Sequence, residues 1–346
     1  MRYAVAVFGI AALVAFAQPA AARPLVIEEF HQCDGTAKVS PEASIAACSQ
    51  ILASPEVRVQ QRPEFLLARA HWHFVAHQTD KALADLNAAL KIKPGDAGIL
   101  ADRALIYVST GQYGAALEDL DAAIKHDPNK GALFSRRAVT KMYVQDWTGA
   151  IDDYSTAVRI GPANAQLLCE RGEARSHLRA VAEAIEDYSA SLAIDPDNEC
   201  ALQARGLSYS LSGDYGKAIV DFDRFVQKNT ANFEIDNARC WARAVLNREL
   251  DVAMADCEKS LALQPGFEQA LDSRAFVHLR MGDNKAAIAD YDSAIAIDSK
   301  RASPWYGRGI AKRRSGDSSA GDADIATAKA IDPKIADTYA GYGVTP

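Results

Sequence analysis

The sequence predicts an all-α fold, an α-α superhelix (solenoid) of about eight helix pairs. Prolines recur every 34 residues and the series resumes after a gap, at Pro94, Pro128, Pro162, Pro196, Pro265 and Pro333. A repeat of this length is typical of helix-turn-helix arrays. Small and large side chains also recur at fixed places within each repeat, as two close-packed antiparallel helices require.

The prolines divide residues 63–335 into eight units, of which the sixth is one residue longer. The units are 63–96, 97–130, 131–164, 165–198, 199–232, 233–267, 268–301 and 302–335. We place the extra residue in the turn of the sixth unit, between Asn247 and Ala253, because both of its helices then keep the register of the others.

Three positions of each unit indicate how its two helices pack. In the fourth unit, position 8 is Gly172, position 20 is Ala184 and position 24 is Tyr188. Small residues let antiparallel helices approach closely, and the large residue fills the seam between them. Position 15 is often glycine, which ends the first helix in the left-handed conformation, and the proline stops the second helix.

The turn motifs at 111–116, 213–218 and 282–287 resemble tetratricopeptide repeats, and the resemblance covers residues 63–335. It implies a scaffold for protein interactions, whose groove is lined by positions 2, 5, 9, 12 and 13 of the first helices. These positions include apolar residues that suit either packing between first helices or binding of a partner, and basic residues near one end. The resulting candidates are Leu105, Val108, Val139, Met142, Tyr143, Leu207, Leu211, Tyr306, Arg280, Arg313 and Arg314.

Every unit also has an arginine at position 7 and an aspartate at position 23. The pairs are Arg69 with Asp85, Arg103 with Asp119, Arg137 with Asp153, Arg171 with Asp187, Arg205 with Asp221, Arg239 with Asp256, Arg274 with Asp290, and Arg308 with Asp324. Both positions lie eight residues from the turn, so antiparallel helices bring them to the same height. We predict structural ion pairs, closed either within a unit or onto the next one, rather than a row of anion sites.

The first 22 residues read as a signal peptide, with Arg2, an apolar run and small residues before a cleavage site after Ala22 or, alternatively, Ala17. Residues 23–62 are predicted to form an N-terminal cap or a degenerate repeat, and 336–346 a C-terminal cap. We expect an exported chain, periplasmic or secreted, with no membrane span after cleavage.

Six cysteines in an exported chain favour disulfides. Cys240 and Cys257 occupy positions 8 and 24 of one unit, whose side chains face each other. We also expect pairing of Cys33 with Cys48 and of Cys169 with Cys200; the last pair joins neighbouring first helices.

Catalytic and cofactor motifs are missing from the sequence, so we expect no enzyme activity, no cofactor and no metal. With 38 basic and 45 acidic residues, the chain is a poor candidate for binding nucleic acid. The leading hypothesis is a scaffold that binds a peptide segment or a protein partner in its groove. The alternative is a structural subunit of a cell-envelope assembly or export complex.

Overall fold

The computed structural model describes residues 27–346, with gaps at residue 163 and at residues 229–230. Within these ranges the chain forms helices and no strand, which confirms the all-α solenoid. The predicted signal peptide, residues 1–22, lies outside the described residues. None of the described helices combines the length and the hydrophobicity that crossing a bilayer requires.

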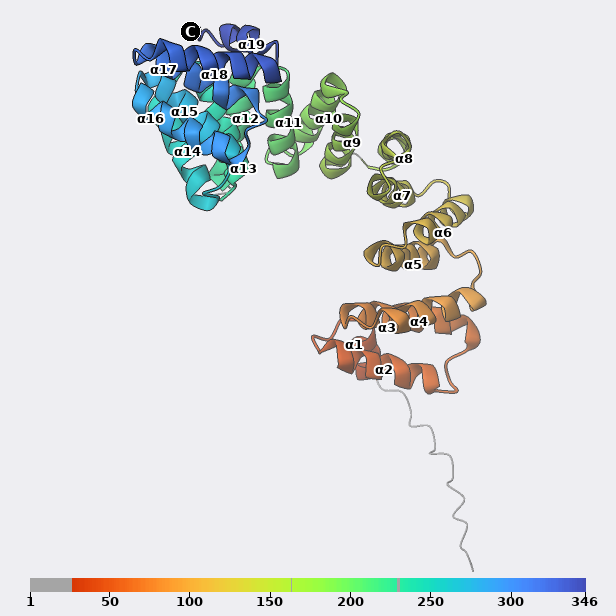
Figure 1. Cartoon of the computed structure of the whole chain (residues 1–346). Coiled ribbons are helices and arrows are strands. Elements are labelled where there is room, and N and C mark those ends of the chain that lie inside the picture. Colours follow the sequence, from red (N-terminus) through yellow and green to blue (C-terminus); the bar gives the residue numbers. More distant parts are fainter. Residues whose placement is uncertain (1–26, 163, 229–230) are drawn as a thin grey trace, which may run out of the picture. The chain divides into compact units, whose positions relative to one another are not determined.

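The chain divides into two compact units, and the first ends at Asp127. It contains a short helix followed by longer ones that pack side by side (Figure 1). These are α1 Ile27–Cys33, α2 Pro41–Ala53, the 3-10 helix η1 Val59–Gln61, α3 Arg62–Val75, α4 Thr79–Ile92, α5 Ala97–Ser109 and α6 Tyr113–His126.

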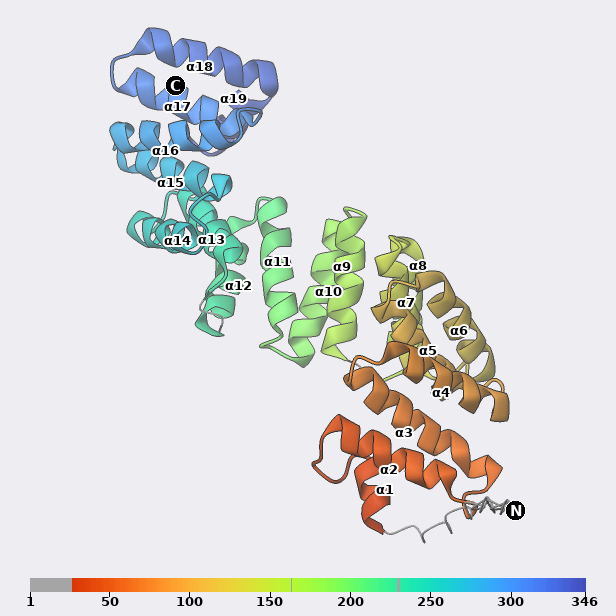
Figure 2. The same cartoon turned by 60° about the horizontal axis from the view of Figure 1, so that its bottom comes forward.

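The second unit begins at Pro128 and contains six helix pairs followed by a short helix (Figure 2). Its helices are α7 Gly131–Tyr143, α8 Trp147–Ile160, α9 Ala165–His177, α10 Val181–Ile194, α11 Glu199–Leu211, α12 Tyr215–Lys228, α13 Phe233–Val245, α14 Leu250–Leu263, α15 Glu268–Met281, α16 Asn284–Ile297, α17 Ala302–Arg314, α18 Ser318–Ile331 and α19 Ile335–Gly341. The extra residue of the sixth pair lies in the turn between α13 and α14.

The seam inside each helix pair depends on a small residue that faces a large one. A Cβ placed on Gly172 would lie 2.6 Å from the ring of Tyr188, and one on Gly206 would lie 2.5 Å from the ring of Phe222. Both rings are buried. The aromatic residue on the second helix therefore fills the space that glycine leaves on the first.

Each ion pair predicted from positions 7 and 23 is confirmed, and it closes within its own helix pair. The arginine Nε donates to one aspartate oxygen at 2.7 to 3.0 Å, and Nη2 donates to the other oxygen. The arginines are partly buried and the aspartates almost fully. This parallel geometry is the strongest arrangement available to a guanidinium and a carboxylate.

In several repeats the remaining arginine nitrogen, Nη1, reaches the second helix of the preceding pair in the same unit. Arg205 Nη1 donates to Ser189 Oγ at 3.0 Å, and Arg171 Nη1 donates to Ser155 Oγ at 3.2 Å. Arg69 Nη1 makes the same bond to Ser49 on α2, at 3.0 Å. One side chain therefore joins three helices, and α2 takes the place that a second helix has in the regular pairs.

All six cysteines form disulfides, in the three pairings that the sequence predicts. Cys33–Cys48 joins α1 to α2, and Cys240–Cys257 joins α13 to α14. Cys169–Cys200 instead connects α9 to α11, the first helices of consecutive pairs.

Removing the arginine of one ion pair is expected to lower the free energy of unfolding more where the aspartate has no second cation beside it. In Arg205→Ala, Asp221 stays buried at 1% exposure with its bidentate partner lost, so we expect a stability loss of about 3 kcal/mol. In the matched variant Arg171→Ala, Arg175 still lies 2.9 Å from the carboxylate of Asp187, and we expect a loss of about 1 kcal/mol.

Urea unfolding followed by circular dichroism measures both losses. Arg205→Met combined with Asp221→Asn removes both charges and is expected to recover part of the stability. Equal losses in the two single variants would show that the buried carboxylate is not the source of the cost.

Removing the Cys240–Cys257 disulfide is expected to lower stability, because the unfolded chain then gains conformational entropy. The bond spans a sequence separation of 17 residues, and closing a loop of that size is worth about 3 kcal/mol in the chain-entropy model. Cys240→Ala combined with Cys257→Ala should therefore melt at a lower temperature than the oxidised wild type. Free thiols at both positions in non-reducing peptide mapping of the wild type would contradict this pairing.

Candidate functional site

In the first unit, the predicted groove residues lie on α5. Leu105 is half exposed and lines a cavity of 110 Å³ together with Leu67, His71 and Phe74 of α3. Val108 lies three residues further along α5 and is half-buried. The apolar face is therefore present here, but the cavity is too small for more than a single side chain.

In the second unit, α7 brings together three predicted residues, Val139, Met142 and Tyr143, at a larger cavity of 310 Å³. We call it the central pocket. Met142 and Val139 are half-buried and Tyr143 is exposed. Its lining comprises Val139, Met142, Tyr143, Trp147, Tyr154, Glu170, Glu173 and His177.

Aromatic rings from two helices, α8 and α9, form one wall of the central pocket. Trp147 at the start of α8 stacks on His177 at the end of α9, with ring centroids 4.0 Å apart and planes 6° apart. Tyr154 is fully buried, and its hydroxyl lies 3.5 Å from the sulfur of Met142. Burial, followed by the nearby Glu170 and Glu173, raises the pKa of Tyr154, so this phenol stays protonated.

Part of the lining is acidic, because Glu170 and Glu173 lie one turn apart on α9. Burial, reinforced by Glu170, raises the pKa of Glu173. Glu170 accepts a hydrogen bond from the Gln166 amide at 3.0 Å. Among the described residues neither carboxylate forms an ion pair, so this part of the lining presents negative charge to any ligand in the pocket.

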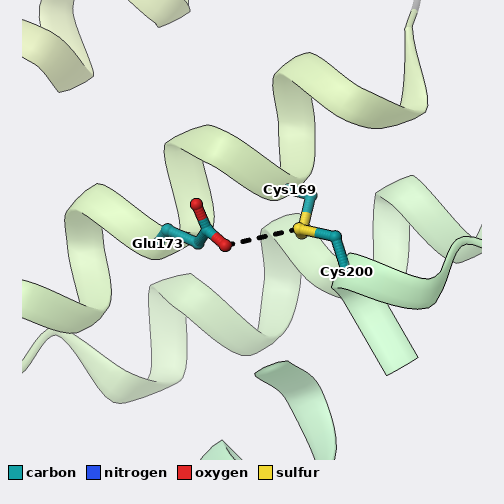
Figure 3. Close-up of side chains that lie close together, drawn as sticks. All are labelled: Cys169, Glu173 and Cys200. Carbon is teal, nitrogen blue, oxygen red and sulfur yellow. Dashed lines mark hydrogen bonds between the residues drawn. A yellow bond between two sulfur atoms is a disulfide. The ribbon is translucent and has the colours of Figure 1, made fainter. Parts of the chain in front are cut away.

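Glu173 also lies against the disulfide that joins α9 to α11. Its Oε1 atom is 3.5 Å from the sulfur of Cys200, as Figure 3 shows. Cys169, Glu173 and Cys200 together have the ligand types of a metal site. The two sulfurs are bonded to each other, however, and a disulfide offers no thiolate to a metal.

Leu207 and Leu211 of α11, also predicted groove residues, are 42% and 75% exposed. They lie one turn apart on the same helix. Side chains this apolar and this exposed are available to a partner.

At the last two helix pairs the chain itself covers part of the surface that the sequence predicts as groove. Tyr306 is buried at 2% exposure, with its ring centroid 4.8 Å from that of Tyr339 on α19. Tyr339 also contacts Phe276 at 5.6 Å between ring centroids, and its hydroxyl donates to the Ser303 carbonyl at 3.0 Å. The helix α19 lies beside α17 in Figure 2.

Two of the basic residues predicted near one end of the groove are also bonded within the chain. Arg280 donates to the carbonyls of Val245, at 3.0 Å, and of Tyr342. Burial, followed by Arg314, lowers the pKa of Arg280. Arg314 donates to the Thr345 carbonyl at 3.2 Å. These two arginines therefore hold the C-terminal segment of the chain in place, which corrects the expectation that they attract an acidic partner.

Arg313 points elsewhere. It is exposed and forms an ion pair with Asp322 of α18 at 3.3 Å. The three basic residues thus do not form one site.

Sequence reasoning missed five residues of the central pocket. Glu173 and His177 occupy positions 9 and 13 of the fourth unit, which are groove positions of the predicted fold, so the signal was present. Glu170 at position 6 falls outside that set. Trp147 and Tyr154 come from a second helix, which a pattern of first-helix positions leaves out.

Profiles of the tetratricopeptide repeat family match residues 70–142 and 136–199. No curated protein sequence is significantly similar to this chain. Among solved structures, a tetratricopeptide repeat protein from Parabacteroides merdae is 20% identical with a TM-score of 0.51, covering 72% of this chain and 99% of that one.

Two further structures share the fold. The C-terminal part of a repeat-containing protein from Cytophaga hutchinsonii is 16% identical with a TM-score of 0.56, covering 71% of this chain and 97% of that one. The Cut9–Hcn1 hetero-tetramer of the APC/C gives 17% identity and a TM-score of 0.50, covering 79% of this chain and 52% of that one. Tetratricopeptide repeats are thus identified by family over residues 70–199, and helix pairs of the same fold continue to Ile331.

Proposed function

We propose that the chain is a non-catalytic interaction scaffold that binds a peptide segment or a protein partner at the central pocket. Tetratricopeptide repeat proteins are in general scaffolds for protein interactions. The observation that carries the proposal is the composition of the pocket, in which an apolar floor lies beside two carboxylates without an ion-pair partner among the described residues. Its volume of 310 Å³ suits one or two side chains of a peptide.

The chemistry of the walls defines the partner that fits. Val139, Met142 and Tyr143 offer contacts to an aliphatic or aromatic side chain. Glu170 and Glu173 favour a lysine or arginine next to it, since a cation would compensate two partly buried negative charges. The partner is therefore a segment with a basic side chain beside an apolar one. The exposed Leu207 and Leu211 on α11 provide further apolar contact.

Export is part of the proposal. The signal peptide predicted at residues 1–22 and the three disulfides both support a periplasmic or secreted location, because disulfides persist in oxidising compartments. The partner is accordingly expected in the same compartment.

A displayed library of twelve-residue peptides, selected on the full chain, tests the pocket. We expect enrichment of peptides with lysine or arginine next to an apolar residue, and salt should weaken their binding. Glu173→Gln should reduce affinity about tenfold, or about 1.4 kcal/mol, because it removes one of the two charges. Glu186→Gln, on an exposed part of α10, is the matched control and should leave affinity unchanged.

Two results would overturn this assignment. One is enrichment of peptides without a basic residue. The other is binding that is insensitive to both Glu173→Gln and Tyr143→Ser. Recovery of a single stoichiometric complex from the envelope fraction, also insensitive to these variants, would favour the structural-subunit alternative.

A second variant separates the central pocket from the covered surface. Tyr339→Ala removes a ring that is 1% exposed, and we expect a stability loss of about 3 to 5 kcal/mol together with binding of the dye ANS to the uncovered aromatic residues. Affinity for the selected peptides should not change. A marked gain in peptide affinity would instead place the binding surface beneath α19.

A further inference from the structure

A further cavity of 370 Å³, larger than the central pocket, lies among the first helices of the last pairs and α19. Trp241 of α13, Tyr339 of α19 and the adjoining Tyr342 provide aromatic walls. Asn237 of α13 and Asp272 of α15 provide polar groups. The volume is within the range of sites for small organic molecules, and the mixture of aromatic surface with a few convergent polar groups is typical of them.

The carboxylate of Asp272 at this cavity is buried, and one of its oxygens has no hydrogen-bond partner among the described residues. The residue is 5% exposed, and the oxygen without a partner is Oδ1. Asn237 Oδ1 and Ser210 Oγ, which belong to residues lining the same cavity, are likewise buried without a partner. Buried acceptors are normally paired, so three unpaired ones at one cavity indicate a missing donor.

The charges around Asp272 do not supply that donor. Arg301 lines the cavity, but its Nη1 atom lies 2.8 Å from Oε2 of Glu268. Burial raises the pKa of Asp272 to about 7; the Ser303 hydroxyl and Arg301 oppose this shift, and Glu268 adds to it. The charge of Arg301, which is paired with Glu268, thus does not offset the effect of burial on Asp272.

We propose that this cavity binds a small organic cation, an amine or amidine, whose N–H groups donate to Asp272 and Asn237. Its apolar part lies against the rings of Trp241 and Tyr342, where a cation also gains from the aromatic faces. The ammonium group can come from a free amine or from a lysine side chain of a bound segment. This site is separate from the central pocket. The proposal for it does not depend on the proposed peptide binding.

Binding of the amine is expected to depend on pH, because its ammonium group contacts the carboxyl of Asp272. Other titratable groups near it are Glu268, Arg301, Tyr291 and Tyr339; burial raises the pKa of both tyrosines well above the usual value, so they stay neutral. A cation needs the ionised form of Asp272, which is present above its pKa and lost below it. For a pKa of about 7, affinity should fall about thirtyfold between pH 8 and pH 5.5.

The test uses phenethylamine, its uncharged counterpart 2-phenylethanol, and lysine capped at both termini, with calorimetry and tryptophan fluorescence on the full chain. We expect at least one of the two amines to bind at least tenfold more tightly than 2-phenylethanol. Binding of phenethylamine identifies a free amine as the ligand, and binding of capped lysine alone identifies a peptide side chain.

Asp272→Asn keeps the shape of the side chain and should abolish both the preference for the amine and its pH dependence. Asn237→Ala should weaken binding of the amine severalfold. This variant tests the site independently if Asp272→Asn proves unstable. Glu268→Gln should retain the pH dependence, because Glu268 pairs with Arg301. Equal affinity for phenethylamine and 2-phenylethanol, unchanged amine binding in Asp272→Asn, or no saturable binding of either amine at 5 mM would overturn the proposal.

Discussion

The fold depends on one arginine per repeat, which binds an aspartate across its own helix pair; in several repeats its third nitrogen also reaches the preceding pair. Arg205 illustrates the arrangement: two nitrogens grip Asp221 in its own pair, and the third reaches Ser189 in the pair before. This pairing is selective because, among the unmodified side chains, a carboxylate offers two equivalent acceptor oxygens to two parallel N–H groups. The third contact is less selective because a single N–H can donate to an oxygen of several side-chain types, as Asn87 and Asp292 show at the same place in other repeats. The bond within each pair is therefore the same in all eight repeats, whereas the partner of the third nitrogen differs from repeat to repeat.

Most of this architecture was predictable because it repeats. The eight helix pairs and their ion pairs follow from positions that recur every 34 residues. The left-handed turn at position 15 was less evident where glycine is absent, yet Gln145 and Arg179 adopt φ values of 61° and 60° there. The packing of the two helices fixes this angle, and a non-glycine residue accepts the strain.

The ends of the array were harder to predict for a physical reason. The 34-residue pattern predicts how a repeat contacts its neighbour. It does not indicate where a segment outside the repeats will lie. The segment from Ile335 onward folds back over Phe276 and Tyr306, and this reverses the assignment of that surface from open to covered. The acidic part of the central pocket was missed because Glu170 faces residues of the preceding pair, a contact that appears only once two pairs are stacked.

The disulfide between Cys169 and Cys200 has a mechanical consequence that the other two do not share. A solenoid flexes by small rotations between successive repeats, and each junction normally yields a little under load. This bond clamps one junction covalently, so elastic deformation within the second unit must concentrate at junctions on either side of it. Glu173 touches the clamp. The acidic part of the central pocket therefore lies beside a covalently linked junction, where a bound segment would meet a surface that the disulfide restrains.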